Sequence, residues 1–95
     1  MDKINFLILD AMADDMEDIS SIKRYLIASK ITIGDYGVKK RIMVLLKEKF
    51  IEIAYPEGID IGNIDFDFAW FLMTKKGRME WDNFYEENKE IFEHQ

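Results

Sequence analysis

The sequence has no cysteine, one proline and one histidine among its 95 residues. Without cysteine, the chain has no disulfide bond, no thiol nucleophile and no cysteine-based zinc site, and this composition fits a reducing compartment such as the cytoplasm. The single histidine, His94, lies one residue from the end of the sequence, where chains usually fray. We therefore expect neither cysteine chemistry nor histidine-dependent catalysis.

Common catalytic and metal-binding motifs are also missing. The chain contains no G-x-S-x-G, no glycine-rich phosphate loop and no H-E-x-x-H sequence. Four oxygen-bearing side chains near residue 63 could suggest calcium, but their spacing does not match an EF-hand loop, which needs a central glycine and a distal glutamate. These residues are Asp60, Asn63, Asp65 and Asp67. We interpret them as a charged turn and expect a protein that is not an enzyme, with no metal and no cofactor.

No long hydrophobic run occurs. The first fifteen residues, MDKINFLILDAMADD, carry one basic residue and an apolar stretch that Asp10 interrupts. This pattern is neither a signal peptide nor a membrane span. Hydrophobic residues nevertheless make up 48% of the chain, which excludes a disordered protein. The length of 95 residues predicts a single domain over residues 1–95. With no signal peptide or membrane span in the pattern, we expect a cytoplasmic protein with no membrane partner.

Positive charge is concentrated in the middle third of the chain. The formal net charge is −6, yet residues 21–50 contain eight basic residues and only two acidic ones, Asp35 and Glu48. The basic residues are Lys23, Arg24, Lys30, Lys39, Lys40, Arg41, Lys47 and Lys49. Because the local field, rather than the net charge, decides what approaches a surface, an anionic partner remains compatible with this acidic protein.

Apolar residues at helical spacing predict three helices in the first half of the chain. The first helix is interrupted by the acidic cluster DDMED, and the second is capped by either Asp18 or Ser20. Residues 30–34 (KITIG) predict a turn or a very short strand, and the third helix is expected over about residues 35–49. The apolar positions are Ile4, Leu7, Ile8, Ala11 and Met12 in the first helix, Ile22, Tyr25 and Leu26 in the second, and Val38, Ile42, Leu45 and Leu46 in the third.

The second half predicts a hairpin followed by a helix. Residues 51–55 (IEIAY) alternate as a strand does, Pro56 ends that strand, and the glycines and asparagine of residues 57–65 are typical of a turn. An aromatic strand then runs to Thr74, which can cap a helix with its side chain. The expected core combines both halves: Leu7, Ile8, Leu26, Ile42, Leu45, Ile53, Trp70 and Leu72.

Two fragments, DFAWFLMTKKGRMEW and VLLKEKFIEIAYP, resemble parts of the winged-helix domains of the bacterial MarR and PadR regulator families. DFAWFLMTKKGRMEW, with its T-x-x-G-R pattern, resembles the passage from the second wing strand into a C-terminal helix. VLLKEKFIEIAYP resembles the passage in which the third helix ends and turns into the first wing strand, although Lys49 and Phe50 stand where many members of these families have glycine. The resemblance implies a mainly helical α+β fold: a three-helix core over residues 1–50, a two-stranded wing over 51–73 and a C-terminal helix over 74–95.

The resemblance also implies that the third helix enters the DNA major groove. Helical spacing predicts an outer face and its flanks as the DNA-binding residues: Tyr36, Lys39, Lys40, Arg41, Met43 and Lys47. Winged-helix proteins often carry Arg or Lys at the wing tip, whereas this tip is acidic, with Glu57, Asp60 and Asp65. We therefore keep two functions open, a transcriptional regulator that binds double-stranded DNA and a winged-helix module that binds another protein. An ordinary solvated helix face would also show lysines.

The last helix predicts a homodimer. Its apolar and aromatic stripe is wide, and PadR-like relatives dimerise through a C-terminal helix. The expected interface residues are Trp81, Phe84, Tyr85, Asn88, Ile91 and Phe92. In the alternative, the helix folds back across the first helix to complete a monomeric core, and only the end near Ile91 is exposed.

Overall fold

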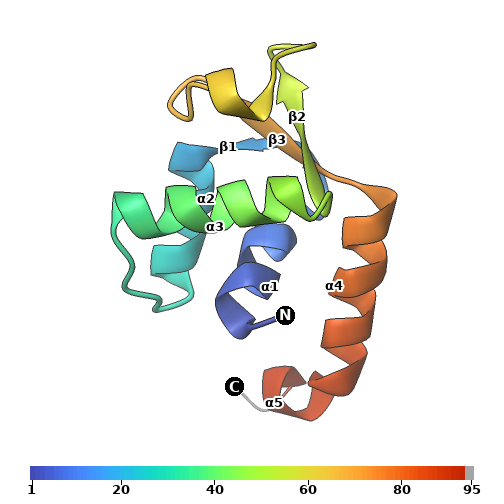
Figure 1. The fold of residues 1–95 in the computed structure, drawn as a ribbon. Coiled ribbons are helices and arrows are strands. Elements are labelled where there is room, and N and C mark those ends of the chain that lie inside the picture. Colours follow the sequence, from blue (N-terminus) through green and yellow to red (C-terminus); the bar gives the residue numbers. More distant parts are fainter. Residues whose placement is uncertain (94–95) are drawn as a thin grey trace.

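The computed structural model describes residues 1–93 and has an α+β fold, as the sequence predicts (Figure 1). Three helices precede a hairpin, and two helices follow it. In chain order the elements are α1 (Lys3–Ala11), β1 (Glu17–Asp18), α2 (Ile19–Ala28), α3 (Asp35–Lys47), β2 (Ile51–Tyr55), a short 3₁₀ helix η1 (Ile61–Asn63), β3 (Trp70–Met73), α4 (Lys75–Glu87) and α5 (Lys89–Glu93).

The three strands form one antiparallel sheet in the order β1-β3-β2. β2 and β3 pair as the predicted hairpin, with Ile51 opposite Met73. β1 was not predicted: it pairs Glu17 with Phe71, where the sequence indicated only an acidic interruption between two helices. A two-residue strand shows no periodicity, and its partner comes from the other half of the chain. The expectation of two strands is therefore corrected to three.

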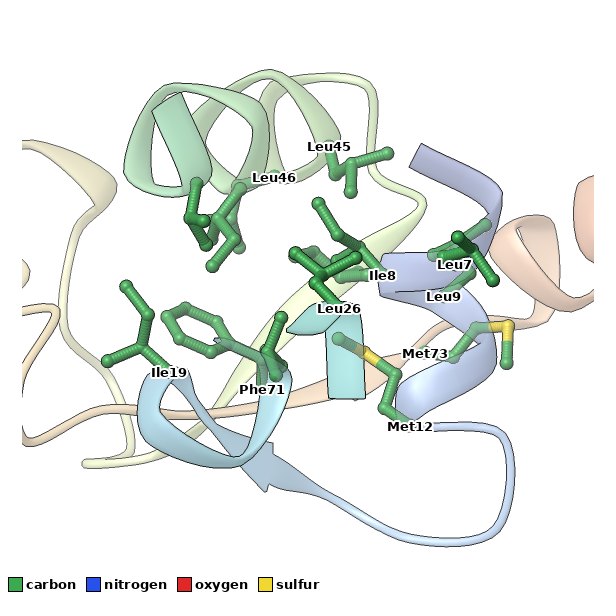
Figure 2. Packing of buried hydrophobic residues seen from close by; sticks show 14 of the residues in the cluster. Leu7, Ile8, Leu9, Met12, Ile19, Leu26, Leu45, Leu46, Phe71 and Met73 are labelled. Carbon is green, nitrogen blue, oxygen red and sulfur yellow. The ribbon is translucent and has the colours of Figure 1, made fainter. Parts of the chain in front are cut away.

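The hydrophobic core lies between α1, α2, α3 and one face of the sheet (Figure 2). Five of the predicted core residues are buried, namely Leu7, Ile8, Leu26, Ile42 and Leu45. The predicted phase of β3 is wrong, because Phe71 and Met73 are buried whereas Trp70 is 37% exposed and Leu72 only partly buried. Residues 68–73 are apolar on both faces, so strand alternation alone does not identify the face that meets the core.

α1 is buried on more sides than the single apolar stripe in its sequence predicts. Phe6, Leu7, Ile8 and Leu9 are consecutive buried residues, because α2 and α3 pack on one side of the helix and α4 packs on another. The ring of Phe6 meets the ring of Phe84 edge-on, with centroids 5.0 Å apart. α4 thus completes the core of its own chain.

Asp10 joins three helices through its carboxylate. It accepts hydrogen bonds from the hydroxyl of Tyr25 on α2 and from the indole Nε1 of Trp81 on α4, the latter at 2.9 Å. Burial, together with this carboxylate, raises the pKa of the Tyr25 hydroxyl above its ordinary value. The Tyr25 hydroxyl, which is protonated at neutral pH even at its ordinary pKa, donates to Asp10. The polar residue that interrupts the apolar run of the first helix thus has a structural role.

Asp18, rather than Ser20, caps α2. Its carboxylate accepts a hydrogen bond from the backbone N–H of Ser21 at 2.9 Å. This hydrogen bond lowers the pKa of Asp18 below its ordinary value. The cap also ends β1, since Asp18 is the last residue of the strand and Ile19 the first of the helix.

Replacing Asp18 with alanine is expected to lower the free energy of unfolding by about 1 kcal/mol at pH 7, because a first-turn N–H loses its acceptor. Since the folded pKa lies below the unfolded one, the carboxylate's electrostatic contribution is complete above the unfolded pKa and disappears as pH falls through the folded pKa. Urea unfolding at pH 7 and pH 3 measures both effects. Asp18→Asn is the matched control, because it keeps a capping oxygen and loses only the pH dependence; equal stability of Asp18→Ala and wild type would contradict the cap.

The T-x-x-G-R motif joins α4 to two distant segments. Thr74 caps α4 as predicted, accepting from the N–H of Gly77 at 3.0 Å, and its hydroxyl donates to the carbonyl of Lys49 at 2.6 Å. Arg78 donates to the carbonyl of Ala13 at 2.5 Å. Lys49, in the turn after α3, has a φ of +63°, the left-handed conformation that glycine favours. The motif therefore holds the end of α3 and the segment after α1.

The last helical region is divided at Asn88, where the sequence predicted one helix over residues 74–95. Asn88 ends α4: its side-chain Nδ2 donates to the carbonyl of Phe84 at 2.9 Å, and its backbone N–H donates to the same carbonyl at 3.1 Å. α5 begins at the next residue. Asparagine competes for backbone hydrogen bonds in this way, which explains the break within a periodic segment.

Candidate nucleic-acid interface

Within residues 1–93, no other helix or strand covers the outer face of α3. α3 packs its opposite side into the core, with Val38, Ile42, Leu45 and Leu46 buried as the helical spacing predicts. On the outer face Tyr36 is 79% exposed, Lys40 and Lys47 are exposed, and Met43 is partly buried. The helix thus presents an aromatic ring and two cations along one line, a combination that can stack on bases and contact phosphates.

Val44 belongs to the same face and was not predicted. It is 45% exposed and lies between Lys40 and Lys47 at helical spacing. The signal was present in the sequence, because residues 40, 44 and 47 follow the i, i+4, i+7 repeat of one helix side. An exposed branched apolar side chain beside two lysines can contact a thymine methyl group or an apolar protein surface.

Arg41, one of the six predicted DNA-binding residues, is paired within the chain. Its Nη1 donates to both carboxylate oxygens of Asp2, at 2.8 and 3.0 Å, and to the side-chain oxygen of Asn5 at 3.0 Å. Partial burial of Asp2 opposes ionisation, but the hydrogen bond from Arg41 lowers the pKa of this carboxyl. Arg41 therefore ties the start of α1 to α3, and Asp2 neutralises its charge.

Lys39, on the other flank of α3, also has an acidic partner. Its Nζ lies 3.6 Å from a carboxylate oxygen of Asp67, in the long segment between β2 and β3. This segment folds back over the protein, and its residues Ile61, Ile64 and Phe66 pack against the hydrophobic core. The end of this segment therefore places the Asp67 carboxylate beside Lys39, a predicted DNA contact on one flank of α3.

Ion pairing reduces the basic excess of residues 21–50. The Nζ of Lys23 lies 2.8 Å from Asp35, and the hydrogen bond from Lys23 lowers the pKa of that exposed carboxyl. With the pairs of Lys39 and Arg41, three of the eight basic residues face carboxylates. Within the part of the chain that the structure describes, the other five belong to no ion pair: Arg24, Lys30, Lys40, Lys47 and Lys49.

The predicted dimer residues lie along α4 and α5. Trp81 and Phe84 contact Phe6 of α1 in the same chain, as the folded-back alternative predicts. Tyr85 and Asn88 are partly buried, whereas Ile91 is 57% exposed. The side chain of Phe92, like all of His94, lies outside the described residues. The homodimer remains a prediction, and Ile91 is its most exposed described residue.

No arrangement in residues 1–93 indicates a metal centre. Among the described residues, no group of three or more histidine, cysteine or acidic side chains is arranged to hold a metal ion. None of the helices described is both long and apolar enough to cross a membrane.

Comparisons with protein-family models, with curated proteins and with solved structures found no match to this chain.

Proposed function

We propose that the chain is a winged-helix DNA-binding protein, a transcriptional regulator with α3 as its recognition helix. The exposed outer face of α3 carries this proposal, because Tyr36 is 79% exposed and Lys40 and Lys47, further along the same side of the helix, are exposed too. The order of elements supports it too, since β2, β3 and the segment between them follow α3 as a wing follows a recognition helix. The proposed role involves no catalysis and no cofactor.

The acidic segment between β2 and β3 gives this wing an unusual role. A basic wing tip would contact DNA phosphates, whereas Asp67 here pairs with Lys39. Binding of duplex DNA along that flank has to separate this pair, which weakens affinity. We therefore place the main DNA contacts on the side of α3 that carries Lys40 and Lys47.

Replacing Lys40 or Lys47 with alanine is expected to weaken duplex binding and to lower the salt dependence by about one unit in the slope of log affinity against log salt, because each removes one phosphate contact. Fluorescence anisotropy of a labelled mixed-sequence duplex, titrated between about 50 and about 200 mM salt, measures this slope. Lys89→Ala, which removes another exposed lysine, on α5, is the control and should leave the slope unchanged.

Asp67→Asn is expected to raise affinity in the same assay, because Lys39 becomes available to a phosphate. Asp60→Asn removes an equal charge from the same segment without breaking an ion pair that the structure shows, and should raise affinity less. If the wild type fails to bind the duplex at the lowest salt, or if Lys40→Ala, Lys47→Ala and Lys89→Ala bind alike, the DNA proposal is wrong.

The second candidate function is a winged-helix module that binds another protein. Val44, which is 45% exposed between Lys40 and Lys47 on α3, favours it, as does the pairing of Lys39 and Arg41 with acidic residues. A protein partner would bury the apolar centre of this face and depend less on salt. Absence of duplex binding by the folded wild type would favour this function.

A further inference from the structure

A second surface, separate from the outer face of α3, combines an aliphatic floor with a basic rim. It is an open groove of about 590 Å³ between the end of α3, β2, the segment near η1 and the start of α4. Its floor is formed by five aliphatic residues: Leu46, Ile51, Ile53, Ile59 and Ile61. Its volume lies within the range of ligand-binding clefts, which are mostly lined by apolar side chains.

Three lysines line the groove, against one acidic residue, Glu52. They are Lys49, Lys75 and Lys76, all exposed. The Nζ of Lys76 donates to the backbone carbonyl of Glu48 at 2.9 Å and lies 4.9 Å from the ring centroid of Phe50. Both of these partners are uncharged, so they hold the lysine in place without cancelling its charge. The groove therefore favours an apolar segment that carries carboxylates.

The same chain carries a segment of this chemistry at the far end of α4. Residues 86–91 (EENKEI) contain three glutamates and one lysine, and Ile91 is 57% exposed. Glu86, Glu87 and Glu90 are not ion-paired within the described residues. We call residues 86–91 the acidic knob, because an apolar side chain projects from it among carboxylates.

The groove and the acidic knob cannot meet within one chain. The groove includes the first residues of α4, whereas the knob contains the last residues of α4 and the start of α5. A helix of 13 residues spans about 20 Å. Figure 1 shows α4 running from the end of β3, on the sheet side of the molecule, to α5 at the opposite end. Any contact between these two surfaces therefore joins two copies.

We propose that the acidic knob of one copy docks into the basic-rimmed groove of a second copy. Ile91 enters the aliphatic floor, and the knob's glutamates face Lys49, Lys75 and Lys76. Because the two surfaces differ, the contact is head-to-tail and leaves one groove and one knob open, unless a ring closes. Tyr36, Lys40 and Lys47 do not line the groove, so this association leaves the outer face of α3 available and does not depend on DNA binding.

Sedimentation velocity from about 10 µM to about 1 mM chain, the range of weak contacts, tests the proposal. The wild type should grow beyond a monomer as concentration rises, and less so at high salt because salt screens the charged rim. A groove variant, Lys75→Glu/Lys76→Glu, and a knob variant, Ile91→Asp, should each associate at least about tenfold more weakly, from charge repulsion and from a charge placed on the aliphatic floor.

Mixing the two variants gives the sharpest result. The groove variant retains an intact knob and the knob variant an intact groove, so an equimolar mixture should form a dimer and nothing larger. Arg24→Glu/Lys30→Glu, which changes the net charge as much as the groove variant but outside the groove, should associate as the wild type does. Circular dichroism checks folding, which the groove variant should retain because glutamate is favourable in the first turn of a helix.

Three outcomes would overturn the head-to-tail contact. The wild type could stay monomeric throughout the concentration range. The groove variant could associate as strongly as the wild type, as a symmetric dimer through α4 alone would. The mixture of the two variants could remain monomeric although each is folded. None of these results depends on whether the protein binds DNA.

Discussion

Replacing Gly77 with alanine is expected to lower the free energy of unfolding by about 3 kcal/mol or more, because the new methyl group has no space. A Cβ at this position would lie 1.9 Å from the carbonyl oxygen of Phe50 and 2.8 Å from its carbonyl carbon. In a helix without such a contact, the same change stabilises by up to about 1 kcal/mol. A loss of stability, rather than a gain, therefore identifies the close approach of the Phe50 backbone to Gly77.

The backbone at Phe50 has little freedom to move away. Its carbonyl accepts from the N–H of Thr74 at 3.0 Å, and its own N–H donates to Leu45 at the end of α3, also at 3.0 Å. Relieving the clash would break these hydrogen bonds or displace the start of α4. Gly77 is thus the position in the T-x-x-G-R motif where the chain requires glycine.

Urea unfolding followed by circular dichroism measures this loss. Gly62→Ala is the matched control: a Cβ there meets nothing within 4 Å and the backbone is not left-handed, so stability should change by no more than about 0.5 kcal/mol. A Gly77→Ala variant as stable as the wild type would show that α4 does not pack this closely against the turn after α3.

Replacing Phe71 with alanine is expected to cost about 3–5 kcal/mol of stability, through lost burial and the cavity left behind. Phe71 is fully buried, and its ring centroid lies 6.3 Å from that of Phe66, which packs against the core from the hairpin segment. Removing the ring therefore weakens both the sheet and the folded-back segment.

Trp70→Ala tests the phase of β3 directly. Trp70 is larger than Phe71 but is 37% exposed on the opposite face of the strand, so its loss should destabilise by about 1 kcal/mol, a typical value for a single substitution. The same urea experiment compares the two variants. A greater loss for Trp70→Ala than for Phe71→Ala would restore the phase that the sequence favoured and contradict the structure.

Local patterns in the sequence determined most of the helices and caps. Val38, Ile42 and Leu45 repeat with the period of a helix, so the buried side of α3 could be predicted without knowing its partners. Thr74 caps a helix through an N–H only three residues away, and IEIAY with Pro56 bounded β2 correctly. These features depend on neighbours in the sequence, whose positions the backbone geometry of a helix or strand determines.

Tertiary structure alone decided which residues face one another across the chain. Both sides of β3 are apolar, so the burial of Phe71 instead of Trp70 depends on the sheet packing its Phe71 face against the helices. The charge at the candidate interface was decided in the same way. Lys39 and Arg41 lie at the predicted flanks of α3, but their carboxylate partners, Asp67 and Asp2, come from distant parts of the chain.

For the two surfaces proposed to bind partners, the sequence predicts one part and only the tertiary structure decides the rest. Helical spacing placed Tyr36, Lys40 and Lys47 on one side of a helix, while only the packed fold shows that this side stays uncovered. The basic-rimmed groove is formed by α3, β2, the hairpin segment and α4. No pattern within a single segment of the sequence therefore predicts it. The period of apolar residues predicts which residues lie on the same side of one helix or strand. A groove or an ion pair between distant segments forms only when the folded chain brings those segments within contact distance.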